Sequence, residues 1–339
     1  MFGYLRFLLA TLVLLSHLKI TCGINQGVTA VVSFYMLAGF VVTHLLTGIF
    51  QPGTTIIKRF FLERFLRIFP LYLYVLALTL IFLILTGFGQ PNFSPTRLMG
   101  NLLVIPLNYY MVWDNSILQD PKFWLVPPAW SLAAELQAYI LLPLVIFSKR
   151  LKMILAGASF LVFMLAVTAA LEPDYFGYRL MPGVFFIFII GTCIYKSTRV
   201  PDQADTFDRI FPPFCYLVAV FCLPLMGFLG SIKRGVVLEV FLGLLLGIPI
   251  IHYLARNSLR LPFDHLLGDL SYGVFISHFL SMWVLTYLFH LQASSFWGAV
   301  AIFLFAVAIS FIGTFILERP LFKYRSKLSV ETKFKARKR

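Results

Sequence analysis

Residues 67–88 read RIFPLYLYVLALTLIFLILTGF, and this stretch decides the fold class. Its only charged residue is Arg67, and it is long enough to cross the hydrocarbon core of a bilayer as an α-helix, which takes about 20 residues. Similar stretches recur along the 339-residue chain, of which 60% is hydrophobic and 12% charged. Soluble domains carry about 25% charged residues and cannot bury so much apolar surface. We therefore predict an all-α, polytopic membrane protein.

About ten segments are predicted to cross the membrane, while the apolar segment 98–112 is too short and is expected to be interfacial or re-entrant. The spacing of Gly243 and Gly247 is consistent with close helix packing. We predict one membrane domain over residues 1–320, followed by a basic tail over 321–339. The predicted spans are roughly 4–21, 28–50, 67–88, 126–147, 152–171, 180–197, 210–229, 235–254, 266–289 and 295–317.

The distribution of positive charge predicts the orientation. Most Lys and Arg residues fall in alternate loops on one side, which are 51–66, 148–151, 198–209, 255–265 and the C-terminal tail. Because cytoplasmic loops are rich in these residues, both termini are predicted to be cytoplasmic. The net charge of +14 is then explained by topology and contact with anionic lipid, so no nucleic-acid partner is expected. The four cysteines are scattered without metal-ligand spacing, and no metal is expected.

The first predicted span carries Arg6 and His17, with Lys19 close to its outer end. Eleven residues turn a helix by about 1100°, roughly 20° beyond three full turns, so the two share a face about 16 Å apart along the axis. Ionisable groups inside spans are costly and usually functional. A snorkelling Arg6 and a hydrogen-bonded interhelical His17 are the structural alternatives, but the shared face favours a common polar cavity.

The fourth predicted span begins at residues 127–131, PPAWS, and carries Glu135 near its outer end. His17 is expected at a similar depth in the first span. A carboxylate beside an imidazole stabilises the imidazolium and determines which ring nitrogen acts as base. The pair therefore suits general-base catalysis, and a buried structural ion pair is the alternative.

Other ionisable residues are less specific. Arg64 and Arg67 are spaced i, i+3 and share a helix face, and Arg59 lies nearby. Arginine forks suit phosphate oxygens, but a role in topology explains the charge equally well. His278 in the ninth span and His44 in the second are, taken alone, more typical of packed, hydrogen-bonded histidines.

Together these residues resemble the membrane acyltransferase-3 family, which includes O-antigen and exopolysaccharide O-acetyltransferases. Six family motifs occur in order. In this chain they fall at Arg6 and His17; at 27–40; at Arg64, Arg67, Ile68, Pro70 and Tyr72; at 130–135, WSLAAE; at Gly268, Ser271, Tyr272, Phe275 and His278; and at 318–320, ERP. The chain departs from the family pattern by a longer spacing after Gly27 and Val28, by Ala38 in place of serine and by Phe275 in place of tyrosine.

The resemblance implies an O-acyltransferase of the bacterial inner membrane. Its donor is expected to be cytoplasmic acyl-CoA, in the first place acetyl-CoA, and its acceptor a hydroxyl of an envelope glycan such as lipopolysaccharide O-antigen. We expect the lipid bilayer as a further partner, and assembly into a homo-oligomer stays open. The chain ends about 20 residues after its last predicted span, so we expect an enzyme that acts on the glycan directly or with a separate protein.

We expect the following residues to carry out the reaction. His17 acts as the base or forms an acyl intermediate, and Glu135 orients it; sequence does not choose between the two chemistries. The donor-binding residues are Arg6, Arg59, Arg64 and Arg67. The substrate-binding residues are Trp130, Ser131, Ser271, Tyr272 and His278.

Two rival functions stay open. Buried Arg, His and Glu also suit a proton-coupled transporter or flippase for a glycan or lipid. Within the enzymes, the acceptor could instead be a small lipid, a peptide or an antibiotic, and the acyl group could be succinyl. A transporter leaves no ester on the glycan, whereas an acyltransferase does.

Overall fold

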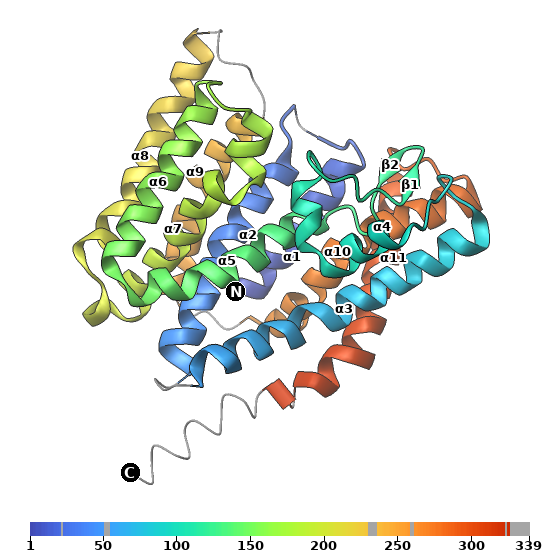
Figure 1. Ribbon diagram of the computed structural model, residues 1–339, viewed down its shortest axis with the longest axis horizontal. Coiled ribbons are helices and arrows are strands. Elements are labelled where there is room, and N and C mark those ends of the chain that lie inside the picture. Colours follow the sequence, from blue (N-terminus) through green and yellow to red (C-terminus); the bar gives the residue numbers. More distant parts are fainter. Residues whose placement is uncertain (22, 51–54, 230–235, 258–260, 323, 326–339) are drawn as a thin grey trace. The chain divides into compact units, whose positions relative to one another are not determined.

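The computed structural model describes residues 1–21, 23–50, 55–229, 236–257, 261–322 and 324–325 (Figure 1). Over these ranges, nine helices are long and apolar enough to cross a membrane. The helix α1 (Phe2–His17) is apolar but shorter. These ten segments correspond to the ten predicted spans, so the all-α polytopic class is confirmed. Most of the predicted tail, residues 323 and 326–339, lies outside the described residues.

The first of two compact units comprises Met1–Phe2, Thr21–Ile49 and Ala134–Pro262. Helix α7 is its centre, since it contacts α2, α6, α8 and α9 (Figure 1), and residues 183–195 of α7 are all buried. The elements are α2 (Gln26–Thr43), a π-helical turn at His44–Ile49, α5 (Ala129–Phe147) from Ala134 onward, α6 (Lys149–Val167), a π-helical turn at Tyr175–Arg179, α7 (Met181–Arg199), a 3-10 turn at Pro201–Gln203, α8 (Thr206–Leu229) and α9 (Val236–Arg256).

Glycines allow the backbones of α2 and α7 to touch. A Cβ atom on Gly191 would lie 1.8 Å from the carbonyl oxygen of Met36, and one on Gly39 would lie 1.9 Å from that of Phe188. Both distances are far below van der Waals contact, so neither position accepts a side chain unless the helices move apart. Small residues commonly permit such close approach between membrane helices.

The predicted close packing at Gly243 and Gly247 is confirmed on α9. A Cβ atom on Gly243 would lie 2.6 Å from Cβ of Val32, and one on Gly247 would lie 2.2 Å from Cε of Met36. Both neighbours belong to α2. Helix α2 therefore packs closely against two helices, α7 and α9, at positions where they carry glycine.

A buried charge cluster joins α6 to the start of α8. The side chain of Lys152 is 1% exposed, and its Nζ lies 2.5 Å from Oδ1 of Asp208 and 3.1 Å from Oδ2 of Asp205. Burial raises the pKa of Asp205, but the hydrogen bond from the backbone of Asp208 and the contact with Lys152 outweigh it, so the pKa lies below its usual value. The two carboxylates therefore compensate the buried ammonium group.

The second unit comprises Gly3–Ile20, Phe50–Ala133 and Phe263–Arg339. Helices α10 and α11 pack closely here: Oγ of Ser310 donates to the carbonyl of Leu270 at 2.8 Å, and it leaves no room for a Cβ atom on Gly273. The elements are α1, α3 (Ile56–Thr86), α4 (Pro95–Leu103), a 3-10 turn at Ile105–Tyr109, β1 (Leu118–Gln119), β2 (Lys122–Phe123), the first residues of α5, α10 (Asp264–Phe289), α11 (Phe296–Gly313) and a π-helical turn at Thr314–Glu318.

Helix α3 begins well before the predicted span, and this corrects the expectation of a loop over 51–66. The helix starts at Ile56 and is continuous to Thr86, with Pro70 inside it. Residues 56–69 contain no glycine or proline, and half of them are Arg, Leu, Lys or Glu, which favour helix. The charged residues set the start of the predicted span at residue 67, because they do not suit lipid, but they can still be part of a helix. As a result, Arg59, Arg64 and Arg67 lie on one helix.

The polar segment between α3 and α5 is ordered by hydrogen bonds. Oδ1 of Asn101 accepts from the backbone of Leu125 at 2.8 Å, and its Nδ2 donates to the carbonyl of Asn115 at 2.9 Å. Hydrogen bonds from Ser116 and from Lys122 lower the pKa of Asp114 to about 2. Helix α4 has nine residues, too few to cross a bilayer, as predicted for 98–112.

Candidate functional site

All predicted site residues except Glu135 belong to the second unit. Arg6 and His17 both lie on α1, which is helical without interruption from Phe2 to His17. The two side chains therefore lie on one face of α1. His17 is the last residue of the helix and is exposed.

Two contacts define how α1 lies against α10. At the start of α1, the backbone N–H groups of Gly3 and Tyr4 donate to Oδ1 of Asp264 at 3.0 and 3.2 Å. At its end, Nδ1 of His17 lies 2.9 Å from Nε2 of His278. Gly3–Asp264 and His17–His278 are each separated by 261 residues. Equal offsets at the two ends mean that α1 and α10 run parallel and in register.

The hydrogen bonds of His278 determine the tautomer of His17. Nδ1 of His278 lies 2.7 Å from the carbonyl oxygen of Phe275. A carbonyl can only accept, so this Nδ1 carries the proton, and in the neutral ring Nε2 is the acceptor. Nδ1 of His17 must then be the donor in the bond between the rings. The lone pair of a neutral His17 is thereby placed on Nε2, the nitrogen turned away from His278.

Aromatic side chains surround the histidine pair. The planes of the two imidazole rings make an angle of 14°. The centroid of the Phe279 ring lies 4.9 Å from that of His17 and 5.0 Å from that of His278. Phe123 and Trp283 pack against Phe279 in turn. His278 itself is 2% exposed. The pair thus consists of an exposed imidazole backed by a buried one, with an apolar wall beside both.

The arginines of α3 are held by carboxylates. Oε1 and Oε2 of Glu318 both lie 3.0 Å from Nη1 of Arg67. Nε of Arg64 lies 2.5 Å from Glu63, whose other oxygen lies 2.6 Å from Nη2 of Arg325. Sequence reasoning quoted Glu318 as part of a motif but gave it no role. The sequence feature that could have indicated a role is its charge, because Glu318 is an acidic residue just after the last predicted span and could pair with an arginine.

Arg67 also connects α3 to α10, since its Nη2 donates to the carbonyl of Gly268 at 3.5 Å. Arg59 lies two turns before Arg67 on the same helix and is half-buried. Gly268 and His278 are ten residues apart on α10, which corresponds to roughly 15 Å along the helix. The arginine cluster and the histidine pair are therefore separated by that distance along one helix.

The hydroxyl groups of the predicted substrate-binding serines, Ser271 and Ser131, donate to nearby backbone carbonyls. Oγ of Ser271 donates to the carbonyl of Gly268 at 2.8 Å, and Oγ of Ser131 donates to that of Pro128 at 2.9 Å. Both residues are buried. Their hydroxyl oxygens can still accept hydrogen bonds, but their protons are committed to backbone carbonyls.

The two predicted aromatic residues lie in the second unit. The hydroxyl of Tyr272 donates to the carbonyl of Ile68 at 3.2 Å, which ties α10 to α3 beside Pro70. Trp130 is 9% exposed, and its carbonyl accepts from Nδ2 of Asn108 at 3.2 Å. The contacts described for these residues are structural, and their substrate roles stay predictions.

Glu135 lies on α5 in the first unit, where it accepts a hydrogen bond from the hydroxyl of Tyr139 one turn later. Its pairing with His17 stays a prediction. The partner that the structure gives to Nδ1 of His17 is His278, which sequence reasoning had placed among the substrate-binding residues. Over the described part of the chain, no group of three or more His, Cys, Asp or Glu side chains is placed to hold a metal ion.

Comparison with known proteins identifies the family of this chain. The model of the acyltransferase-3 family, described as an acyltransferase domain, matches residues 2–319. The chain belongs to the acyltransferase-3 family. No solved structure matches it. Membership makes the chain a multi-pass membrane acyltransferase.

Two relatives of this acyltransferase-3 protein are described only as uncharacterized proteins. One, from Aquifex aeolicus, is 38% identical over 167 residues, which cover 49% of this chain and 75% of the relative. The other, from Haemophilus influenzae, is 24% identical over 249 residues, which cover 67% of this chain and 99% of the relative. Neither description names a donor or an acceptor.

Proposed function

We propose that this chain is an O-acyltransferase of the bacterial inner membrane that moves an acyl group, in the first place acetyl, from cytoplasmic acyl-CoA to a hydroxyl of an envelope polysaccharide such as O-antigen. Membership of the acyltransferase-3 family supports the general part of this proposal, that the chain is a membrane acyltransferase. The observation that supports the chemistry is the hydrogen bond between His17 and His278. It gives an exposed imidazole a defined tautomer at the end of a membrane helix.

The reaction follows from that tautomer. Nε2 of His17 takes the proton of the acceptor hydroxyl, and the oxygen attacks the carbonyl carbon of the thioester. The tetrahedral intermediate collapses with cleavage of the carbon–sulfur bond, and the CoA thiolate takes the proton back from the imidazolium. An acyl-histidine intermediate would use the same Nε2 as nucleophile. In both routes Nδ1 keeps its proton and its bond to His278.

The arginine cluster supports an acyl-CoA donor. The phosphates of CoA and its thioester lie at opposite ends of an extended pantetheine arm. A matching site therefore needs cations and a base separated along the membrane normal, and the roughly 15 Å between Gly268 and His278 provides such a separation. Glu318 and Glu63 hold Arg67 and Arg64 in fixed positions. Arg59 would add a cation without a carboxylate partner among the ion pairs of the described residues.

The decisive experiment is an acyl-transfer assay with matched histidine variants. The purified protein is reconstituted in nanodiscs with labelled acetyl-CoA and envelope glycan from a strain that lacks the gene. Wild type and His265→Ala, which changes an exposed histidine of α10, should ester-link the label to the glycan. His17→Ala should not.

Two results would reject the proposal. If wild type moves glycan across the membrane without forming an ester, the chain is a transporter. If His17→Ala labels the glycan at the wild-type rate, the imidazole has no part in the chemistry. Mass spectrometry of the envelope glycan from the deletion strain identifies the sugar and the acyl group that are lost.

A further inference from the structure

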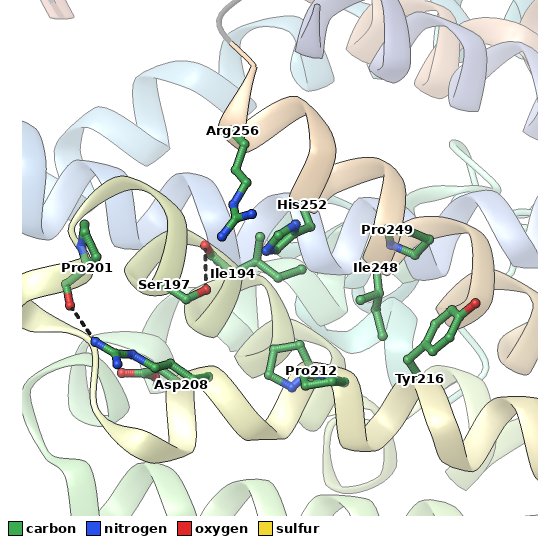
Figure 2. A pocket seen from close by; sticks show the side chains of 12 residues that line it. Ile194, Ser197, Pro201, Asp208, Pro212, Tyr216, Ile248, Pro249, His252 and Arg256 are labelled. Carbon is green, nitrogen blue, oxygen red and sulfur yellow. Dashed lines mark hydrogen bonds between the residues drawn. The ribbon is translucent and has the colours of Figure 1, made fainter.

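The first unit contains a cavity of about 650 Å³ between α7, α8 and α9 (Figure 2). It lies within the first unit, and none of the residues proposed for acyl transfer lines it. One part of its wall is apolar and is made by Ile194, Pro212, Pro213, Ile248 and Pro249. The other part carries the guanidinium groups of Arg209 and Arg256 and the imidazole of His252. The cavity is therefore amphipathic, with a basic end.

The basic end is built by two helices. His252 and Arg256 are spaced i, i+4 on the last turn of α9 and share a face, and Figure 2 shows both side chains directed into the cavity. Arg209 belongs to the first turn of α8 and donates from Nη2 to the carbonyl of Pro201 at 3.3 Å. A guanidinium group has five N–H donors, so this bond uses only a part of its capacity.

The acid in the wall does not neutralise these cations. Asp208 receives hydrogen bonds from Nζ of Lys152 at 2.5 Å and from the backbone of Asp205 at 3.2 Å. Lys152 is shared with Asp205, so this cluster carries one net negative charge, which is smaller than the charge of the two guanidinium groups. Oγ of Ser197, the other polar group at this end, donates to carbonyls of its own helix. The basic end keeps a net positive charge, and an anion would complement it.

The helices around the cavity face lipid. Both α8 and α9 have the length and hydropathy of membrane spans. Their outer faces expose large apolar side chains, which indicates contact with acyl chains. These side chains are Ile210, Phe214 and Leu217 on α8, and Leu246, Ile250 and Tyr253 on α9. A ligand that is apolar at one end and anionic at the other fits this position.

We propose that the cavity binds an anionic phospholipid, with its phosphate at Arg209, His252 and Arg256 and part of an acyl chain along the prolines of α8 and α9. Arginine forks match phosphate oxygens in geometry and charge. Basic pockets between membrane helices on the cytoplasmic side suit acidic headgroups, and the charge of the adjoining loops predicts that side here. A soluble phosphate compound such as coenzyme A shares the phosphate chemistry but would leave the apolar wall unused.

The test measures lipid binding to the full-length protein in detergent by native mass spectrometry, with phosphatidylglycerol and phosphatidylcholine as probes. Wild type should bind phosphatidylglycerol about tenfold more tightly or better, and Arg209→Gln/Arg256→Gln should lose this preference, because each charge-assisted hydrogen bond contributes to that extent. Lys149→Gln/Arg150→Gln, which removes the same charge from exposed positions on α6, should keep it. His17→Ala should also keep it, because this site is independent of acyl transfer.

Thermal unfolding without added lipid checks that the variants fold. If the Arg209/Arg256 variant unfolds too readily to purify, Arg256→Gln alone should reduce the preference in a folded protein. Equal binding of both lipids by wild type would overturn the proposal, and so would an unchanged preference in the folded variants. Displacement of bound phosphatidylglycerol by coenzyme A or inorganic phosphate would assign the cavity to a soluble anion and would overturn the lipid assignment.

Discussion

Nδ1 of His17 lies 2.9 Å from Nε2 of His278. This hydrogen bond lies at one end of the contact between α1 and α10, and the bond from Gly3 to Asp264 lies at the other end. In each pair the two residues are 261 positions apart, so the register of α1 against α10 brings the two imidazoles within hydrogen-bond distance. Phe275 completes the arrangement through its carbonyl, which holds the proton of His278 on Nδ1. A displacement of either helix by one turn, about 5 Å, would break the pair.

Replacement of His278 should lower the rate of acyl transfer without weakening donor binding. We expect His278→Leu to reduce kcat about tenfold to hundredfold, the range for residues that orient a functional imidazole, with an unchanged KM for acetyl-CoA. His278→Gln should recover part of the rate, since its amide oxygen can accept from Nδ1 of His17. Steady-state kinetics in nanodiscs measures both constants. Equal rates for the Leu and Gln variants would contradict a positioning role.

Arg59 is the most informative of the arginines proposed to bind the donor. Arg59→Gln should raise the KM for acetyl-CoA about tenfold, because one charge-assisted hydrogen bond to a phosphate is lost. The kcat should change little. Arg150→Gln, an exposed arginine on α6, serves as the control for net charge. A KM that is equal in wild type and Arg59→Gln would remove this residue from the donor site.

The ion pair between Arg67 and Glu318 should support folding. Its side chains are 16% and 5% exposed. Glu318→Gln leaves this nearly buried guanidinium with only the more exposed Asp269, 3.8 Å away, as a carboxylate partner, and should cost about 3 kcal/mol. The double variant Arg67→Met/Glu318→Leu should recover much of that loss. Thermal unfolding in detergent measures both effects. A double variant as unstable as the single one would show that the charges act independently.

Packing between α2 and α7 should depend on the absence of a side chain at Gly191. Gly191→Ala drives a Cβ atom toward the carbonyl of Met36 and should destabilise the protein by about 1–3 kcal/mol. Gly157→Ala is the control, since no atom lies within 4 Å of its Cβ position on α6. That change should stabilise the helix by up to about 1 kcal/mol. Equal melting temperatures for both variants would contradict the close contact.

Hydropathy predicts the fold class of this chain well, because a bilayer requires long apolar helices whatever their partners. Hydropathy also explains why the start of α3 was missed. The predicted span excluded the charged residues Lys58, Arg59 and Arg64, but the helix continues through them, beyond its apolar part. Hydropathy locates the part of a helix that suits lipid, and not the ends of the helix.

Pairing between helices is what the sequence could not supply. Periodicity places Arg6 and His17 on one face of α1, but it gives no register against another helix, so the partner of His17 on α10 was not foreseen. The link between Arg67 and Glu318 was hidden in the same way, because 251 residues separate them. Motifs pointed to these residues individually, and only the packing of the helices shows which of them touch.

The central claim is that His17 carries out the acyl transfer, and the rate of CoA release tests it most directly. Free thiol is measured as acetyl-CoA is consumed in the presence of the glycan acceptor, with wild type, His265→Ala and His17→Ala at equal folded concentration. We predict that His17→Ala lowers kcat about 10²-fold to 10⁴-fold, the contribution expected of a positioned base, while His265→Ala matches wild type. A His17→Ala enzyme that releases CoA and forms ester at the wild-type rate would contradict the claim.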